Sequence, residues 1–139
     1  MAASADEAAV LAANEAFYAA FRARDFAAME AAWSPREEIV CIHPGWTPLW
    51  GRQAVLGSWA RILANPGNPQ LVPRNPKVIL MGDAACVLCL EAAADGVIAA
   101  TNVFAREDGL WRMVSHHGAG IAVGPEPDAP APRHRGPLH

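Results

Sequence analysis

A histidine in a turn is the first residue of this sequence that could carry proton transfer. His43 is followed by Pro44 and Gly45, a turn signal that ends a short β-branched run. An imidazole has an unperturbed pKa of about 6.5, so His43 could exchange protons near neutral pH with little tuning. The alternative is a structural histidine that holds the turn through its ring nitrogens.

Glu91 lies in an otherwise apolar run, where a carboxylate needs a partner or a raised pKa. Arg106 and His117 are expected on the same face as Glu91, which leaves both a salt-bridged structural role and a catalytic role open. His116 and His117 are adjacent on an expected strand and point to opposite faces, so only one of them can join a site with His43. We assign His117 to the mouth of a pocket. No ligand set at metal-binding spacing accompanies these histidines, so the sequence predicts no metal and no cofactor.

Aromatic side chains surround the expected position of His43. Trp46 and Trp50 follow it on a loop that could act as a lid over an apolar pocket, and Trp59 lies on an expected helix. Helix spacing alone would also account for Trp59 as a core residue. The expected substrate-binding residues are Phe17, Trp46, Trp50, Trp59, Glu91, Phe104 and His117.

The composition is that of one globular domain. The chain has 139 residues, of which 53% are hydrophobic, and a formal net charge of −3. This mild acidity argues against a nucleic acid or an anionic membrane as partner, and no apolar run approaches the roughly 18 residues that cross a bilayer. The acidic start does not resemble a signal peptide, and three cysteines do not make a disulfide framework, so we expect a cytoplasmic protein.

Hydrophobic spacing predicts three helices and a short strand in the first half of the chain. Residues 6–23 form the first helix, and Asp25 can cap a second, shorter one. Residues 38–42 are a short β-branched run, and Gly51 opens the third helix. Pro73 and Pro76 keep the following stretch extended and near a sheet edge.

Four β-rich runs between residues 77 and 118 predict an antiparallel meander, which after three helices gives an α+β fold. They are separated by Gly82-Asp83, Asp95-Gly96 and Asp108-Gly109. If each dipeptide is a two-residue hairpin turn, Asn102 pairs with Cys89 on one side and Ser115 on the other. This register places Glu91, Asn102, Phe104 and His117 on one face.

Both faces of the expected sheet are largely apolar, and three helices cannot easily cover both. We therefore expect helices on one face and a second copy of the chain on the other, convex face, as an isologous homodimer. Residues 124–139 contain five prolines and almost no apolar side chains, which predicts a Pro-rich tail after a domain over residues 1–123.

The order of these features resembles the nuclear transport factor 2-like superfamily, the cone-shaped α+β fold of SnoaL-like polyketide cyclases and ketosteroid isomerases. The resemblance covers about residues 8–122 and implies a curved antiparallel sheet packed on three N-terminal helices. It rests on Arg24-Asp25-Phe26, Ile42-His43-Pro44-Gly45, Gly51, Thr101-Asn102-Val103-Phe104, Asp108-Gly109-Leu110-Trp111 and His116-His117-Gly118. Residues 75–86 also resemble the association domain of calcium/calmodulin-dependent kinase II.

The resemblance implies an apolar small molecule in a cavity and a cofactor-free isomerase, cyclase or dehydratase. In the ketosteroid isomerases an Asp-Pro pair at the place of His43-Pro44 supplies the general base, and a protonated aspartic acid at the place of Asn102 donates to an oxyanion. These matches imply His43 as the base and Asn102 as the hydrogen-bond donor. The alternative for Asn102 is a buried amide that satisfies a neighbouring backbone or side-chain group. The isomerases' tyrosine falls near Phe17 rather than Tyr18.

The alternative is a non-catalytic oligomerisation or ligand-binding module that resembles the kinase association domain. Two pocket arginines of that domain match Glu91 and Asn102 here, so the acid-binding pocket does not carry over. The superfamily hosts both classes, and its fold does not decide between them.

Overall fold

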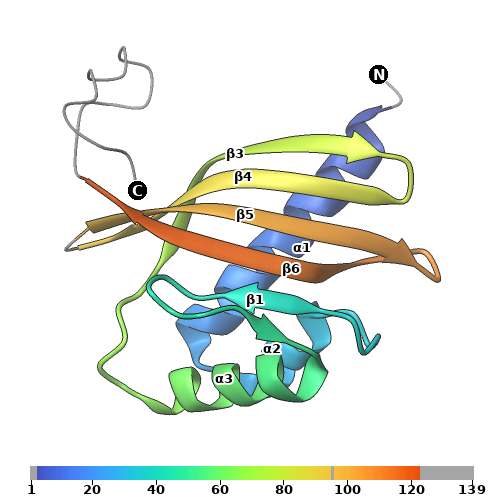
Figure 1. Ribbon diagram of the computed structural model, residues 1–139. Coiled ribbons are helices and arrows are strands. Elements are labelled where there is room, and N and C mark those ends of the chain that lie inside the picture. The colour runs from blue at the N-terminus through green and yellow to red at the C-terminus, as the bar shows by residue number, and fades with distance from the viewer. Residues whose placement is uncertain (1–2, 95, 123–139) are drawn as a thin grey trace.

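The computed structural model describes residues 3–94 and 96–122, which form three helices on one side of a six-stranded sheet (Figure 1). The helices are α1 (Ala3–Ala23), α2 (Phe26–Ala32) and α3 (Arg52–Ala64). The strands are β1 (Val40–Ile42), β2 (Leu49–Trp50), β3 (Val72–Met81), β4 (Ala84–Ala93), β5 (Gly96–Glu107) and β6 (Leu110–Ile121). The predicted α+β class is confirmed, whereas the predicted tail over residues 124–139 lies outside the described residues.

Local capping signals set where the second and third helices begin. The Asp25 side chain accepts a hydrogen bond of 3.0 Å from the backbone N–H of Ala28 and so caps α2. Gly51 precedes α3 with a φ of 96°, in a region of backbone conformation that favours glycine. Both helix starts agree with the sequence prediction.

The sheet order is β2-β1-β6-β5-β4-β3, and its only parallel pair within the described residues is β1 with β6. The sheet is therefore mixed, whereas the sequence predicted a purely antiparallel sheet. The β3 strand forms an edge and contains Pro73 and Pro76, as predicted, because an edge strand tolerates residues without a backbone N–H. The parallel pair brings the end of β1, just before His43, alongside His116 and His117 on β6.

A β-bulge corrects the predicted pairing of β5 with β6. Phe104 pairs with Met113, but Val103 pairs with Ser115, so β6 contains one extra residue at Val114. Asn102 consequently pairs with His116, and the predicted pairing with Ser115 is wrong. Because side chains alternate along a strand, one extra residue turns all later side chains of β6 to the opposite face.

The pairing of β4 with β5 differs from the prediction in a less consequential way. Ala93 pairs with Gly96, so Gly96 belongs to β5 and not to the predicted turn. Asn102 pairs with Val87 instead of Cys89, a shift of two residues. A two-residue shift preserves the faces of a strand, so Glu91 and Asn102 still lie on the same side of the sheet.

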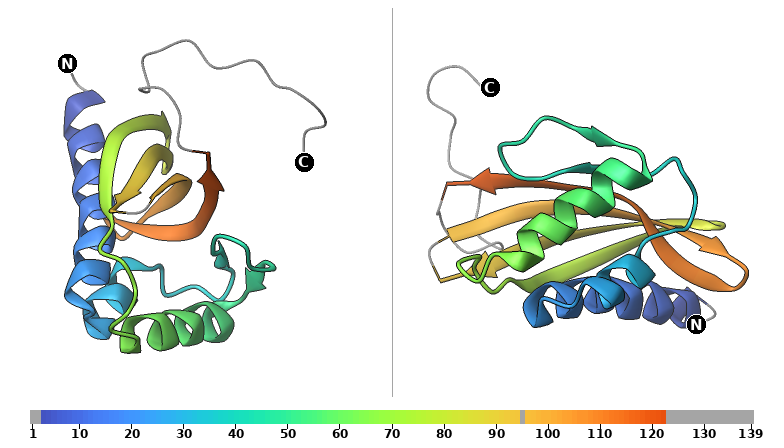
Figure 2. Two further views of the ribbon diagram at one scale, coloured as in Figure 1. Left: turned by 90° about the vertical axis from the view of Figure 1, so that its left-hand side faces the viewer. Right: turned by 90° about the horizontal axis from the view of Figure 1, so that it is seen from below.

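The inner face of the sheet packs on the three helices, and no other element of residues 3–94 and 96–122 covers the outer face (Figure 2). Inner-face side chains such as Val87, Phe104 and Met113 are fully buried. On the outer face, Ile79 and Leu88 keep 52% and 44% of their surface exposed. The three helices therefore do not cover this apolar face of the sheet.

Candidate functional site

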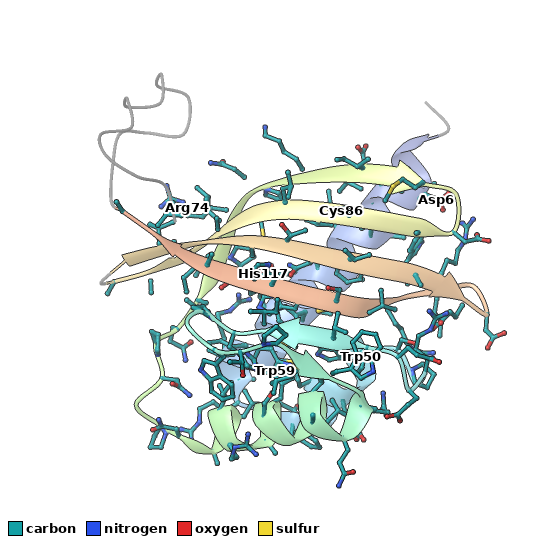
Figure 3. The ribbon with its side chains drawn as sticks, in the orientation of Figure 1. Asp6, Trp50, Trp59, Arg74, Cys86 and His117 are labelled. Carbon is teal, nitrogen blue, oxygen red and sulfur yellow. The ribbon has the colours of Figure 1, made fainter. Side chains whose placement is uncertain are left out.

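A cavity of about 270 Å³ lies between α1, α3 and the inner face of the sheet. This volume lies near the lower end of the range for small-molecule sites, so the cavity suits a small ligand. Figure 3 shows Trp59 in this region, between α3 and the sheet. The lining residues are Phe17, Tyr18, Phe21, His43, Pro44, Trp46, Trp59, Ile62, Asn68, Pro69, Leu71, Glu91, Ile98 and His116.

His43 enters the cavity from the residue after β1 and is 4% exposed. The Ser58 hydroxyl donates to the carbonyl of Val55 over 2.7 Å, so its oxygen is free to accept a hydrogen bond of 2.9 Å from His43 Nε2. This leaves Nδ1 as the unprotonated nitrogen of the neutral ring. Burial lowers the pKa of His43 to about 4, and the positive charge of Arg61 adds to the effect.

His116 lies beside His43 because β1 and β6 are neighbours, with the two ring centroids 6.5 Å apart. His116 Nδ1 is 2.6 Å from the side-chain oxygen of Asn102, which accepts a hydrogen bond from it. The other nitrogen, Nε2, is 3.8 Å from Glu91 Oε2. Burial lowers the pKa of His116 to about 3, and the nearby His43 and His117 add to the effect. His116 is therefore a neutral imidazole at neutral pH.

Glu91 is 2% exposed and lines the same cavity. The Tyr18 hydroxyl donates a hydrogen bond of 2.5 Å to Glu91 Oε2. Burial raises the pKa of Glu91, and the bond from Tyr18 opposes this only in part. Glu91 and His116 would form an ion pair if a proton moved between them, but burial disfavours both charged forms. Burial therefore shifts this pair toward a carboxylic acid beside a neutral imidazole.

The expected partners of Glu91 are wrong. Arg106 instead pairs with Asp6 and Asp83, at 3.0 and 2.8 Å. His117 is exposed on the outer face because the bulge in β6 turns it away from Glu91. The predicted place of His117 at the mouth of this cavity is therefore also wrong.

Asn102 lies on the inner face as expected but does not line the cavity. It is fully buried, and its amide nitrogen donates to Asn14 Oδ1 over 2.8 Å and to the Tyr18 hydroxyl over 3.1 Å. Its oxygen accepts from His116. With these bonds the amide has no donor left for a ligand, so Asn102 orients His116 instead.

The structure brings together only some of the expected substrate-binding residues. Phe17, Trp46 and Trp59 line the cavity together with Glu91 and His43. Trp50 is 74% exposed and does not line it, whereas Phe104 is fully buried in the core. The geometry therefore does not support a lid that Trp46 and Trp50 form together.

Sequence reasoning missed His116 and Tyr18 as residues of this cavity. The adjacent residues His116 and His117 indicated that one histidine of β6 faces inward. Which of the two does so depends on the bulge in β6. Tyr18 is buried beside Phe17 because both side chains of α1 face the core, with ring centroids 4.8 Å apart. The resemblance placed the isomerases' tyrosine near Phe17, and the structure has both Phe17 and the Tyr18 phenol lining the cavity.

Residues 3–94 and 96–122 contain no group of three or more histidine, cysteine or acidic side chains that could hold a metal ion. Within the same described residues, no helix is long and apolar enough to cross a membrane.

Comparison with known proteins identifies the family. The sequence profile of the SnoaL-like domain matches residues 10–123. The chain belongs to the SnoaL-like family. This places it in the nuclear transport factor 2-like superfamily, as the resemblance predicted.

Two solved structures share this fold. A candidate dehydratase of the nuclear transport factor 2-like family from Streptomyces avermitilis is 33% identical, with a TM-score of 0.79 over 86% of this chain and 99% of that chain. A candidate calcium/calmodulin-dependent kinase II association domain from Thiobacillus denitrificans is 36% identical, with a TM-score of 0.74 over 80% of this chain and 94% of that one. No curated protein matches the chain.

Proposed function

We propose that this SnoaL-like protein is a cofactor-free dehydratase that acts on a small, largely apolar β-hydroxy carbonyl compound. The observation that carries the proposal is the pair formed by His116 Nε2 and Glu91 Oε2, 3.8 Å apart in one cavity. One of these groups accepts a proton in its resting state and the other can donate one. Such paired groups with opposed pKa shifts are the usual means of running acid and base chemistry at one pH.

In the proposed reaction, His116 Nε2 removes the proton from the carbon next to the carbonyl. The electron pair of that C–H bond forms the new C=C bond, and the C–O bond to the β-hydroxyl breaks. Glu91 gives its proton to the departing oxygen, which leaves as water. The product state holds protonated His116 beside ionised Glu91, and a proton passed back between them restores the resting pair.

Charge balance supports this assignment. The cavity is neutral before the reaction, and the charges formed during it have opposite signs and lie 3.8 Å apart. Attraction between opposite charges is strong in a site with little water. The similarity to a candidate dehydratase from Streptomyces avermitilis, at 33% identity over 99% of that chain, also favours elimination.

The test is the elimination itself. β-Hydroxycyclohexanone is small and uncharged, and its dehydration to the conjugated enone is followed by ultraviolet absorbance. We expect conversion by the purified protein above the buffer rate. Unchanged rates with this compound and with larger β-hydroxy ketones of similar polarity would rule out the proposed reaction.

In this proposal His43 binds the substrate, whereas the resemblance implied that His43 is the general base. It lines the cavity, and its Nε2 is engaged by Ser58, so we assign its Nδ1 to accepting a hydrogen bond from the substrate hydroxyl. Replacing His43 with phenylalanine is expected to raise KM and to lower kcat/KM about tenfold, since a hydrogen bond contributes about 0.5–1.5 kcal/mol. Steady-state kinetics check this. A loss of kcat in His43→Phe as large as that in His116→Gln would restore His43 as the base.

We further propose that the protein is a homodimer through the outer face. Ile79, Met81 and Leu88 are exposed there by 52%, 55% and 44%, beside a shallow hollow of about 440 Å³. A contiguous apolar surface of this kind marks an interaction site in most soluble proteins. A calcium/calmodulin-dependent kinase II hub from S. rosetta shares the fold at 21% identity, with a TM-score of 0.65 over 81% of this chain and 95% of that chain.

Placing a charge on this face is expected to separate the two copies. Sedimentation velocity should show a dimer for the natural sequence and a monomer for Leu88→Lys, because burying an unpaired ammonium at an interface is costly. Leu110→Lys is the matched control, since Leu110 is also exposed, at 52%, but lies beside the β5–β6 turn. A natural chain that stays monomeric would contradict the dimer, and a ring larger than a dimer would favour the non-catalytic assembly module.

A further inference from the structure

A chain of buried amides links α1 to the candidate base. Asn14, Asn102 and His116 are 2%, 0% and 3% exposed and come from α1, β5 and β6. We propose that Asn14 is a positioning residue that acts through Asn102 to hold His116 as the tautomer with its proton on Nδ1. Nε2 then remains unprotonated toward the cavity. The catalytic consequence rests on the proposed function, whereas the tautomer does not.

The hydrogen-bond directions follow from what each group can donate or accept. An amide nitrogen only donates and an amide oxygen only accepts. The Asn102 nitrogen faces Asn14 Oδ1 at 2.8 Å and the Tyr18 hydroxyl at 3.1 Å. The Asn102 oxygen is therefore the atom that faces His116 Nδ1, at 2.6 Å, and it requires a proton on that nitrogen.

Asn14 decides this orientation more firmly than Tyr18 does. A hydroxyl can accept or donate, so Tyr18 would tolerate either orientation of the Asn102 amide. The Asn14 oxygen cannot donate, so reversing the Asn102 amide alone would place two acceptor oxygens against each other. Asn14 thus excludes the reversed amide, in which the Asn102 nitrogen would face His116 and would require an unprotonated Nδ1.

The tautomer matters because the two nitrogens of His116 point to different places. With the proton on Nδ1, the lone pair of Nε2 faces the cavity and Glu91, at 3.8 Å from Oε2. With the proton on Nε2, the cavity would meet a donor and the base would be lost. In a catalytic dyad of this kind, holding the correct tautomer is a large part of the contribution of the second residue.

The direct test is nitrogen NMR of the full chain labelled with 15N-histidine, with the His116 signals assigned by their loss in His116→Gln. In the natural sequence we expect Nδ1 to be protonated and Nε2 unprotonated at neutral pH. Asn14→Leu removes the acceptor at nearly constant volume and should shift His116 toward the Nε2-protonated form. Asn14→Asp keeps an acceptor oxygen and should restore the natural tautomer.

Steady-state kinetics of the Asn14 variants provide a second test. Asn14→Leu should lower kcat about 10- to 100-fold with little change in KM, a loss typical of residues that orient a reacting histidine. Asn14→Asp should recover most of that loss, and thermal melting confirms that both variants fold. A natural chain with the proton on Nε2, or an Asn14→Leu variant that retains the natural tautomer, would overturn the inference. Both results are obtained without substrate, so they separate this inference from a failure of the proposed reaction.

Discussion

Replacing His116 with glutamine is expected to lower kcat by about 10²- to 10⁴-fold, the usual contribution of a general base. Glutamine still fills most of the space beside Asn102, but its amide cannot take a proton from carbon at neutral pH. The loss corresponds to about 3–5 kcal/mol of transition-state stabilisation. It is measured as the rate of β-hydroxycyclohexanone dehydration under saturating substrate.

The neighbouring histidine supplies the control for His116→Gln. His117→Gln makes the same chemical change one residue further along β6, on the exposed outer face. We expect its kcat to stay close to that of the natural chain. If His116→Gln kept its kcat while melting at a similar temperature, His116 would not be the base.

Replacing Glu91 with glutamine is expected to lower kcat about 100-fold and to change the pH profile. The active form of Glu91 is the protonated one, and burial raises its pKa above the ordinary value of 4.5. The rate of the natural chain should therefore fall as the pH rises through this raised pKa. On the acid side, the pKa of His116, about 3, keeps the base unprotonated over the usual range of assay. Glutamine does not ionise, so the variant should lose the alkaline decline.

The same substitution at a solvent-exposed site tests whether the effect is local. Glu38→Gln removes a carboxylate from an exposed position next to β1, and we expect its rate and pH profile to match the natural chain. A natural profile in which the rate rises with pH would contradict the assignment, because it would mean that ionised Glu91 acts as a base. Rates are measured in buffers of constant ionic strength.

The elements of this fold were predictable where short-range signals determine them. Asp25 and Gly51 cap the helices that follow them, and both signals lie within a few residues of the structure that they set. The Asp108-Gly109 dipeptide forms the turn between β5 and β6, with Glu107 paired to Leu110. Two prolines in β3 marked a sheet edge, because their missing N–H groups cannot serve a central strand.

The site depends on features that short-range signals do not encode. The extra residue at Val114 turns His116 inward and His117 outward, the reverse of the predicted register. No sequence pattern near Val114 predicts this bulge. The parallel pairing of β1 with β6, which places His43 beside His116, joins segments more than seventy residues apart. Register errors of this kind change which residue reaches the cavity even where the fold is right.

The hydrogen-bond partners of Asn102 were also not predictable from short-range signals. Its inner face was predicted correctly, since the error in the β4–β5 register was two residues. Its partners, Asn14 and Tyr18, come from a helix more than eighty residues earlier in the chain. These bonds, and not its place on the strand, direct the Asn102 amide to His116 rather than to a ligand.

Exchange of carbon-bound hydrogen in D2O tests most directly whether His116 works as a base in this cavity. Cyclohexanone has the acidic hydrogens next to its carbonyl but no leaving group, so NMR isolates the proton abstraction from the elimination. We expect the natural chain and His117→Gln to incorporate deuterium at the carbon next to the carbonyl, and His116→Gln to do so no faster than buffer. Equal incorporation by His116→Gln and the natural chain would contradict the assignment of the base.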